Sequence, residues 1–346
     1  MANGDARKQH YTPRLLLRAF AVERKPGKFQ IGVFDKHTGT TFRCPIEDIA
    51  AERDFNTLET DSHVFSWETR LGDIEDMAAP VIDRVRKQAS LEGVGDSDKA
   101  SLAIFAAAQF IRGTDYRARY SELCRAIAKR AVAIAGEKPV APEILEAGSD
   151  QDTRIATLRA LQDNLTEFAQ HFANKQLMLL EAPSGSRFLI GDSPVTMFNK
   201  RTFGPYGNMG LAVLGIQLYL PISTSLTLGF WCLSHREEYE QAIREGQRDL
   251  QRSRGFALLA DAAERQTILT ARKSVEGAIR RMSARIADLD IGKSEKLEAD
   301  HVEHMNSLQV ANAERFVMSV DGTFDLVRRM IGDNPRYKTG QRISMD

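Results

Sequence analysis

Two pairs of polar residues in the first third of the chain have spacings that bring their side chains together. Glu68 and Glu75 are seven residues apart, which is two helical turns, so a helix presents both carboxylates on one face. Gln109 and Arg112 are three apart and likewise share a face, at the end of an apolar segment (102–111) that is typical of a buried helix. Because an uncompensated buried charge costs several kcal/mol, we expect Glu75 or Glu68 to pair with Arg112.

These four side chains have two interpretations. The first is a structural network of buried polar groups that ties two helices together. The second is a polar pocket that holds a phosphate or a divalent cation, Mg²⁺ or Mn²⁺, and activates a water molecule for hydrolysis. In the second interpretation six residues form the pocket, and Glu68, Glu75 and Asp192 are the metal ligands. The six are His10, Glu68, Glu75, Gln109, Arg112 and Asp192.

His10 and Asp192 complete this candidate site, and both also have structural explanations. His10 precedes a predicted helix, where its imidazole can act as a general base or a ligand, or can pack and bond to a neighbouring backbone group. Asp192 follows a predicted strand, where an aspartate most often caps a turn, although strand ends also position catalytic carboxylates. His301 and His304 have a spacing that a metal can use, but exposed histidines are common on helices.

Other catalytic signatures are absent from the sequence. It contains no GxSxG, P-loop, GxGxxG or HExxH motif. The three cysteines, Cys44, Cys124 and Cys232, are far apart and have no spacing typical of zinc or of a disulfide framework.

Three hypotheses about function follow from these residues. One is a metal-dependent hydrolase, such as a nuclease or phosphodiesterase, with His10 as its base. The second is a non-catalytic module that recognises a ligand or a partner, in a bacterial defence or toxin setting. The third is a purely structural network, with the function carried by the charged helical residues 236–292.

The composition says more about the location and partners of the protein than about the reaction it could catalyse. The chain has 346 residues, of which 47 are basic and 47 acidic. A formal net charge of zero gives no support to a nucleic-acid partner, although a local basic groove would not show in the sum. The N-terminus is polar, and no segment approaches the roughly 18 apolar residues that a membrane span requires. We therefore expect a cytoplasmic protein without a membrane partner; its substrate and other partners are not identified.

The hydrophobic patterns predict an α+β fold that is mainly α-helical, with an N-terminal β-hairpin and a small central antiparallel sheet. Residues 1–234 and 293–330 are expected to form a single domain, which a charged helical hairpin, residues 235–292, extends. Thr12 is expected to cap a helix starting at Pro13, and Pro80 to kink or divide a helix. The predicted hairpin pairs residues 29–34 with 40–44. The predicted helices cover residues 63–89, 96–111, 115–135, 150–174 and 294–320. The predicted strands cover residues 175–181, 187–190, 218–220 and 226–233; the first two strands are expected to pair with each other, and so are the last two.

The opening segment His10-Tyr11-x-Pro13-x-x-x-Leu17-Arg18-x-Phe20 resembles that of the bacterial domain-of-unknown-function family 4238. The resemblance covers residues 9–320 and implies kinship, without a settled activity. Leu16 departs from it, since the family usually has an aromatic residue there, and the charged stretch at 240–290 is longer than usual. Further segments match in the same order: Glu52-Arg53-Asp54-Phe55, Glu68 with Glu75, Gln109-Phe-Ile-Arg112, Phe188-Leu-Ile-Gly-Asp192-Ser-Pro194, Leu220-Pro221-Ile-Ser223, Asn306 and Ala313-Glu314-Arg315.

Overall fold

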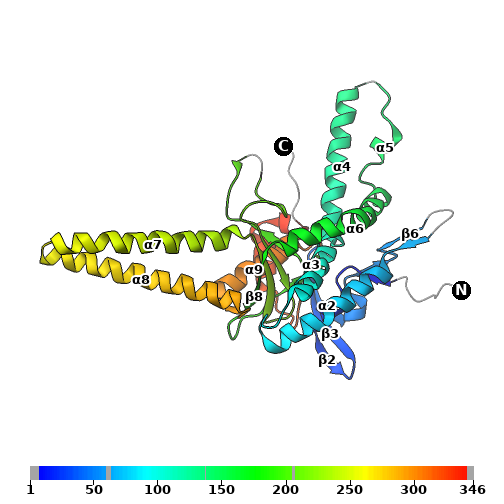
Figure 1. The fold of residues 1–346 in the computed structure, drawn as a ribbon. Helices are drawn as coiled ribbons and strands as arrows, with labels where there is room; N and C mark the ends of the chain where they lie inside the picture. Colours follow the sequence, from blue (N-terminus) through cyan, green and yellow to red (C-terminus); the bar gives the residue numbers. More distant parts are fainter. Residues whose placement is uncertain (1–7, 60–63, 137, 205–206, 341–346) are drawn as a thin grey trace.

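The structure is a computed structural model that describes residues 8–59, 64–136, 138–204 and 207–340. It is mainly helical with several small sheets, mostly antiparallel, which confirms the predicted fold class. Figure 1 shows a body from which two helical units extend in different directions. One is the antiparallel pair α7 (Ser234–Leu259) and α8 (Ala262–Asp290), which corresponds to the predicted charged hairpin. The other is α4 (Thr114–Ala135) with the short α5 (Pro142–Leu145).

The central sheet has the strand order β10-β11-β12-β8-β13. The predicted pairing of the last two strands is confirmed, since β11 and β12 are antiparallel neighbours. The predicted pairing of residues 175–181 with 187–190 is wrong, because β8 has β12 on one side and β13 on the other. The strands are β8 (Gln176–Glu181), β10 (Thr196–Phe198), β11 (Gln217–Pro221), β12 (Leu226–Trp231) and β13 (Glu295–Lys296).

A second sheet joins three distant parts of the chain. The predicted hairpin is confirmed as β3 paired with β4, and β3 also pairs with β2 and with β14, which in turn pairs with β9. The helix predicted for residues 294–320 is therefore shorter, and α9 (Ala299–Asn312) lies between β13 and β14. The strands are β2 (Val22–Lys25), β3 (Lys28–Asp35), β4 (Thr40–Pro45), β9 (Ile190–Gly191) and β14 (Phe316–Ser319).

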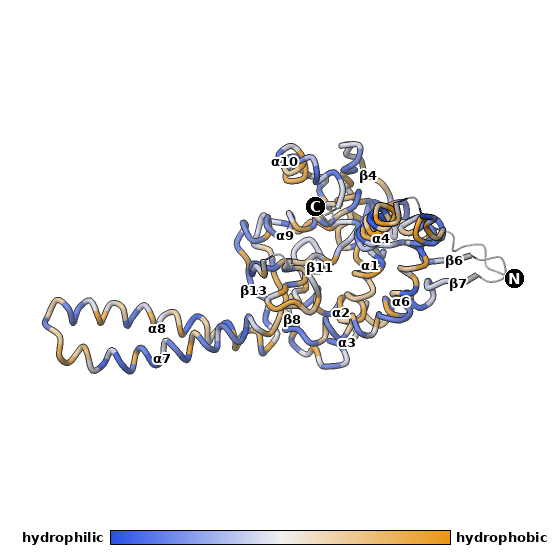
Figure 2. The backbone as a smooth tube through the Cα atoms, turned by 90° about the horizontal axis from the view of Figure 1, so that it is seen from above, coloured by the Kyte–Doolittle hydropathy of each residue, from blue (hydrophilic) through white to orange (hydrophobic). Residues whose placement is uncertain are grey.

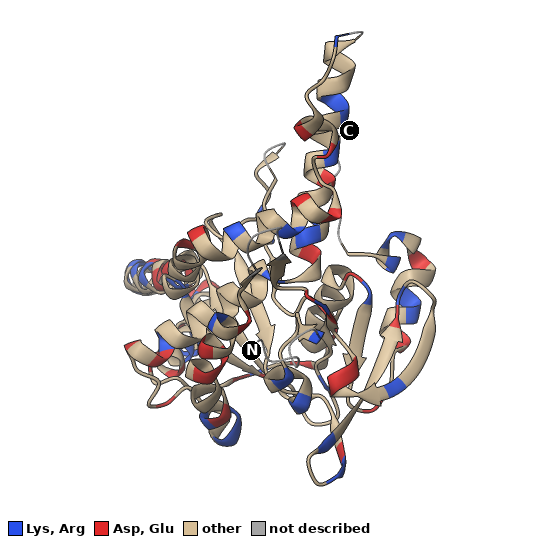
Figure 3. Ribbon diagram, turned by 90° about the vertical axis from the view of Figure 1, so that its right-hand side faces the viewer, with Lys and Arg blue, Asp and Glu red and all other residues tan. Residues whose placement is uncertain are grey.

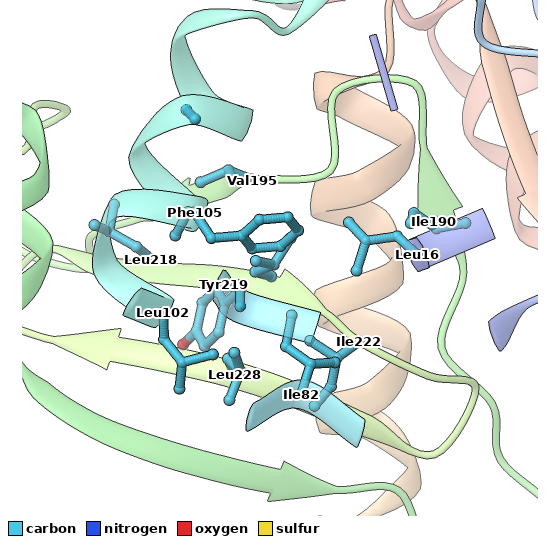
Figure 4. Packing of buried hydrophobic residues seen from close by; sticks show 14 of the residues in the cluster. Leu16, Ile82, Leu102, Phe105, Ile190, Val195, Leu218, Tyr219, Ile222 and Leu228 are labelled. Atoms are coloured by element: carbon cyan, nitrogen blue, oxygen red, sulfur yellow. The ribbon is translucent and has the colours of Figure 1, made fainter. Parts of the chain in front are cut away.

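The core lies between the central sheet and three long helices, α2 (Glu68–Gln88), α3 (Asp96–Ile111) and α6 (Asp150–Ala173). The apolar run in α3 is buried, as expected for a helix that packs against both α2 and α6. In Figure 4, Leu102 and Phe105 of α3 lie close to Tyr219 and Leu228 of the sheet. The remaining elements are β1 (Lys8–His10), α1 (Arg14–Ala19), η1 (Ile46–Asp48), β5 (Ala51–Arg53), β6 (Thr57–Glu59), β7 (Val64–Ser66), α10 (Asp325–Asp333) and η3 (Pro335–Lys338).

Three local predictions near the N-terminus need correction. The helix predicted to start at residue 63 starts at Glu68, because residues 64–66 form β7 and pair with β6. Pro80 does not divide α2. Because proline has no backbone N–H, the carbonyl oxygen of Asp76 loses its helical partner, but Asp76 and Pro80 are both exposed, so water can bond to that oxygen. Thr12 does not cap α1; Pro13 is the N-cap residue, and the Thr12 hydroxyl donates to the Asp192 carbonyl oxygen at 3.1 Å.

Charged and apolar residues are interspersed over the helical extensions, and exposed apolar residues, Phe256, Leu258 and Leu259, gather at the end of α7. Figure 3 shows basic and acidic residues interspersed over the molecule, in keeping with a net charge of zero. Figure 2 shows polar and apolar residues alternating along α7 and α8. Across the part of the chain that the structure describes, no helix is long and apolar enough to cross a membrane.

Candidate functional site

Arg112 is the centre of the polar cluster that the sequence predicts. It follows the last residue of α3 and is only 2% exposed. Its Nη2 donates to Glu75 Oε1 at 2.6 Å, and its Nε donates to Gln109 Oε1 at 3.0 Å. The prediction that Arg112 pairs with a carboxylate is confirmed, and Glu75 of α2 supplies it. The ion pair ties α2 to the end of α3.

Glu68 and His10 lie at the edge of this cluster, and both interact electrostatically with Arg112. Glu68 accepts a hydrogen bond from Asn56 Nδ2 at 2.6 Å. Burial raises the pKa of the Glu68 carboxyl, although the bond from Asn56 and the charge of Arg112 oppose the shift. His10 Nε2 donates to the carbonyl oxygen of Ile46 at 3.2 Å, and burial lowers the pKa of its imidazole in spite of that bond. At neutral pH His10 is therefore an uncharged ring anchored to the backbone.

Asp192 organises a turn. It is 1% exposed, and its two oxygens accept three backbone hydrogen bonds, each 2.8 Å long. The donors are the N–H groups of Glu314, Arg315 and Phe316, which connect α9 to β14. This is the structural explanation of Asp192, and it accounts for the early end of the predicted helix, because the three N–H groups bond to the carboxylate.

Four of the other five predicted site residues, His10, Glu68, Glu75 and Gln109, thus gather around Arg112, while Asp192 is bonded elsewhere, at the turn between α9 and β14. Within the described ranges, no group of at least three His, Cys, Asp or Glu side chains could hold a metal ion. Those ranges include Glu68, Glu75 and Asp192. The predicted metal ligands gain no support from this arrangement. The cluster around Arg112 as a binding site stays a prediction; Gln109 Nε2, which is buried without a partner among the described residues, is the atom that a ligand would engage.

A larger polar cleft lies beside this cluster, and the sequence prediction missed it. Its volume is about 450 Å³, and α4, α6 and the segment after β5 form its walls. We call it the arginine cleft, after its three basic residues, Arg117, Arg125 and Arg154. The other charged residues that line it are Glu52, Glu122, Asp150 and Glu314.

Arg117 is the residue that distinguishes this cleft. Its guanidinium carbon lies 3.3 Å from the centre of the Phe55 ring, and its Nη2 donates to the Phe55 carbonyl oxygen at 2.7 Å. Its Nε is buried and has no partner among the described residues. Burial, together with the charge of Arg154, lowers the pKa of the Arg117 guanidinium to about 9, although Glu52 opposes the shift. The Arg117 guanidinium is thus held in one position, in surroundings that disfavour its charged form.

In the ranges that the structure describes, no carboxylate forms an ion pair with Arg117, Arg125 or Arg154. One signal in the sequence could have indicated this site: Arg117, Ser121 and Arg125 recur at four-residue steps and share a face of the helix predicted for 115–135. The contribution of Arg154 had no such signal, because it comes from another helix.

Asp115, in the first turn of α4, makes the stability of this region depend on pH. Burial raises the pKa of its carboxyl from 3.8 to about 6, although Arg119, bonded to it at 2.9 Å, opposes the shift. Between about pH 4 and pH 6 the folded protein therefore binds more protons than the unfolded chain, so this group's contribution to stability falls as the pH rises through that window. The full difference is about 3 kcal/mol, from a shift of about two units at 1.36 kcal/mol each.

We expect the variant Asp115→Asn to lose this dependence. Urea unfolding of both proteins at pH 4 and pH 7 measures most of it: the decrease in unfolding free energy between the two pH values should be about 2 kcal/mol smaller in the variant. An identical decrease in both proteins would contradict the raised pKa.

Comparison with known proteins adds a family and no activity. A family model described as "Protein of unknown function (DUF4238)" matches residues 8–323. No curated protein and no solved structure matches the chain.

Proposed function

The chain belongs to the DUF4238 family of proteins of unknown function, and from the geometry of the arginine cleft we propose that it binds a small anionic molecule there, through a phosphate or carboxylate group. The observation that carries this proposal is Arg117, a half-buried guanidinium that forms no ion pair with a carboxylate among the described residues. A lone buried charge is costly. A bound anion would offset that cost, because the planar guanidinium matches phosphate and carboxylate oxygens in a two-bond geometry.

The surroundings of Arg117 support a binding role. Stacking on Phe55 fixes the plane of the guanidinium before a ligand arrives, so little further ordering is needed. Arg125 and Arg154 line the same cleft and add positive charge to its wall. A volume of about 450 Å³ lies within the usual range of sites for small metabolites, about 300–1,000 Å³.

The acidic residues of the cleft narrow the class of ligand. Glu52 and Asp150 are exposed side chains that line the same cavity as the arginines. Carboxylates accept hydrogen bonds and repel further negative charge. We therefore propose a ligand that combines one anionic group with hydroxyl or amino groups, such as a sugar phosphate or a hydroxy acid, in preference to a polyanion.

A metal-dependent hydrolase is the less well supported alternative. Nuclease or phosphodiesterase chemistry with Glu68, Glu75 and Asp192 as ligands requires carboxylate oxygens that converge on one cation. One oxygen of Glu75 is bonded to Arg112, and both oxygens of Asp192 are bonded to backbone N–H groups. Recognition of an anion requires no rearrangement of these bonds.

A panel of anions tests the proposal. The panel contains inorganic phosphate, pyrophosphate, glucose 6-phosphate, citrate and malate, at matched ionic strength, with thermal shift and calorimetry as readouts. We expect at least one compound with a single anionic group to raise the Tm of the protein and to bind with a Kd below about 1 mM. Arg125→Ala and Arg154→Ala should each weaken that binding about tenfold, the value of one charge-assisted contact at a partly exposed site.

Arg159→Ala is the matched control, because Arg159 is an exposed arginine on α6 that does not line the cleft. Its Kd should stay within about twofold of the wild-type value. Absence of binding across the whole panel, or an equal loss in Arg159→Ala and Arg154→Ala, would contradict the proposal.

A further inference from the structure

A second cavity lies where the helical hairpin joins the body. Its volume is about 380 Å³, and its walls come from the central sheet, the first turns of α7, the last turns of α8, and α9. Figure 1 shows the ends of α7 and α8 meeting the body near β8 and α9. We call it the joint cavity. It shares no lining residue with the arginine cleft.

Aromatic rings form much of the wall of the joint cavity. The ring centres of Tyr219 and Trp231 are 6.4 Å apart and nearly perpendicular, and those of Phe198 and His304 are 4.6 Å apart in a similar arrangement. Tyr239 also lines the cavity, and Met305 is another apolar neighbour. Flat, rigid surfaces of this kind favour a flat ligand, because ring faces and edges stack with little loss of side-chain entropy.

Polar atoms of this wall are buried and unpaired. Arg285 Nε and His304 Nε2 have no hydrogen-bond partner among the described residues, whereas the Trp231 side chain interacts with the Tyr219 hydroxyl. A buried polar atom without a partner costs about 1–3 kcal/mol, and such atoms are rare in folded proteins. Both atoms belong to residues that line one cavity, and a molecule bound there would complete their hydrogen bonds.

Apart from the exposed Lys200, the Arg and Glu side chains that line the cavity are in ion pairs, which favours a molecule with a neutral ring. Arg285 Nη2 pairs with Glu295 Oε1 at 2.7 Å, and its Nη1 is bonded to the Tyr239 hydroxyl, so its charge is already compensated. Burial, together with the neighbouring His301, lowers the pKa of His304, whose ring is therefore uncharged at neutral pH. The unpaired Nε–H group of Arg285 is a donor only. The missing partner must therefore carry acceptor atoms, such as ring nitrogens or carbonyl oxygens.

We propose that the joint cavity binds a planar, neutral heteroaromatic molecule of the nucleobase or nucleoside class, whose ring stacks on the aromatic wall and whose ring acceptors accept a hydrogen bond from Arg285 Nε. A ligand at this position contacts both the hairpin helices and the sheet. Its binding requires no anion and is independent of the arginine cleft.

Intrinsic fluorescence tests this inference directly, because the chain has only two tryptophans, Trp67 and Trp231. In the variant Trp67→Phe, Trp231 is the sole emitter. We expect at least one of adenosine, guanosine, cytidine and uridine to change its emission, excited at 295 nm, in a saturable way with a Kd below about 1 mM. The nucleosides lack phosphate, so this readout is separate from anion binding, and Arg117→Ala on the same background should leave it unchanged.

Two variants locate the binding. His304→Ala and the milder Tyr239→Phe, both in the cavity wall, should raise the Kd at least about fivefold, and at least one is expected to fold as the parent does by circular dichroism. His171→Ala is the control, because His171 lies on α6 and does not line the cavity. A titration without a saturable change for any of the four nucleosides, or an affinity unaffected by both wall variants, would overturn the inference.

Discussion

Replacing Asp192 with alanine is expected to lower the free energy of unfolding by about 5 kcal/mol. The variant leaves the backbone N–H groups of Glu314, Arg315 and Phe316 without the acceptors that bond to them at 2.8 Å. Each unpaired buried donor costs about 1–3 kcal/mol. The turn from α9 into β14 would lose its main restraint, and β14 is the strand that joins β3 to β9. Urea denaturation followed by circular dichroism measures the change.

Asp300→Ala is the matched control for this prediction, because Asp300 is an exposed acidic residue in the first turn of α9. It should change the unfolding free energy by less than about 1 kcal/mol. Asp192→Asn keeps one acceptor oxygen, so its loss in unfolding free energy should lie between those of Asp192→Ala and Asp300→Ala. A loss of 1 kcal/mol or less in Asp192→Ala would show that this carboxylate is not the restraint on the turn.

Removing the guanidinium of Arg112 has the second largest expected effect. Arg112→Ala should cost about 4 kcal/mol, since truncating one partner of a buried ion pair costs about 3–5 kcal/mol. The variant also leaves a cavity between α2 and α3, because Arg112 is one of the largest fully buried side chains. The same urea denaturation measures it.

A second arginine provides a control within the same pair of helices. Arg84 on α2 pairs with Asp98 on α3, but its side chain is 39% exposed. Arg84→Ala should therefore cost no more than about 1 kcal/mol. The double variant Glu75→Met/Arg112→Met should recover most of the loss, because apolar side chains of similar volume can replace a buried ion pair. Equal losses for Arg84→Ala and Arg112→Ala would contradict the view that burial sets the value of the Glu75–Arg112 pair.

The parts of the fold that local patterns specify were predictable. The apolar run at 102–111 predicts the buried α3, and the aromatic and β-branched segments around residue 39 predict the hairpin of β3 and β4. The pairing of β9 with β14 was not predictable, because those strands are more than 100 residues apart and each is very short. Whether Thr12 bonds to its own helix or to Asp192 likewise depends on a contact between distant segments.

The candidate site was predictable only where a charge had to be compensated. The partner of Arg112, Glu75 on α2, was predictable because the need of a buried arginine for a carboxylate does not depend on details of the fold. For Asp192 the residue type allowed both a catalytic and a structural role, and the bonds from residues 314–316 account for the structural role. The arginine cleft required two helices and the Phe55 segment to be placed together, which no spacing within one element reveals.

The most direct test of the proposed function is the affinity of Arg117→Ala for the anion that binds best in the panel, measured by titration calorimetry. We expect its Kd to rise about 100-fold or more, which corresponds to about 2.7 kcal/mol, while Arg117→Lys, which keeps the charge without the planar fork, loses less. Arg130→Ala, an exposed arginine on the same helix that does not line the cleft, should bind as the wild type does. A folded Arg117→Ala variant with the wild-type Kd would contradict the proposal.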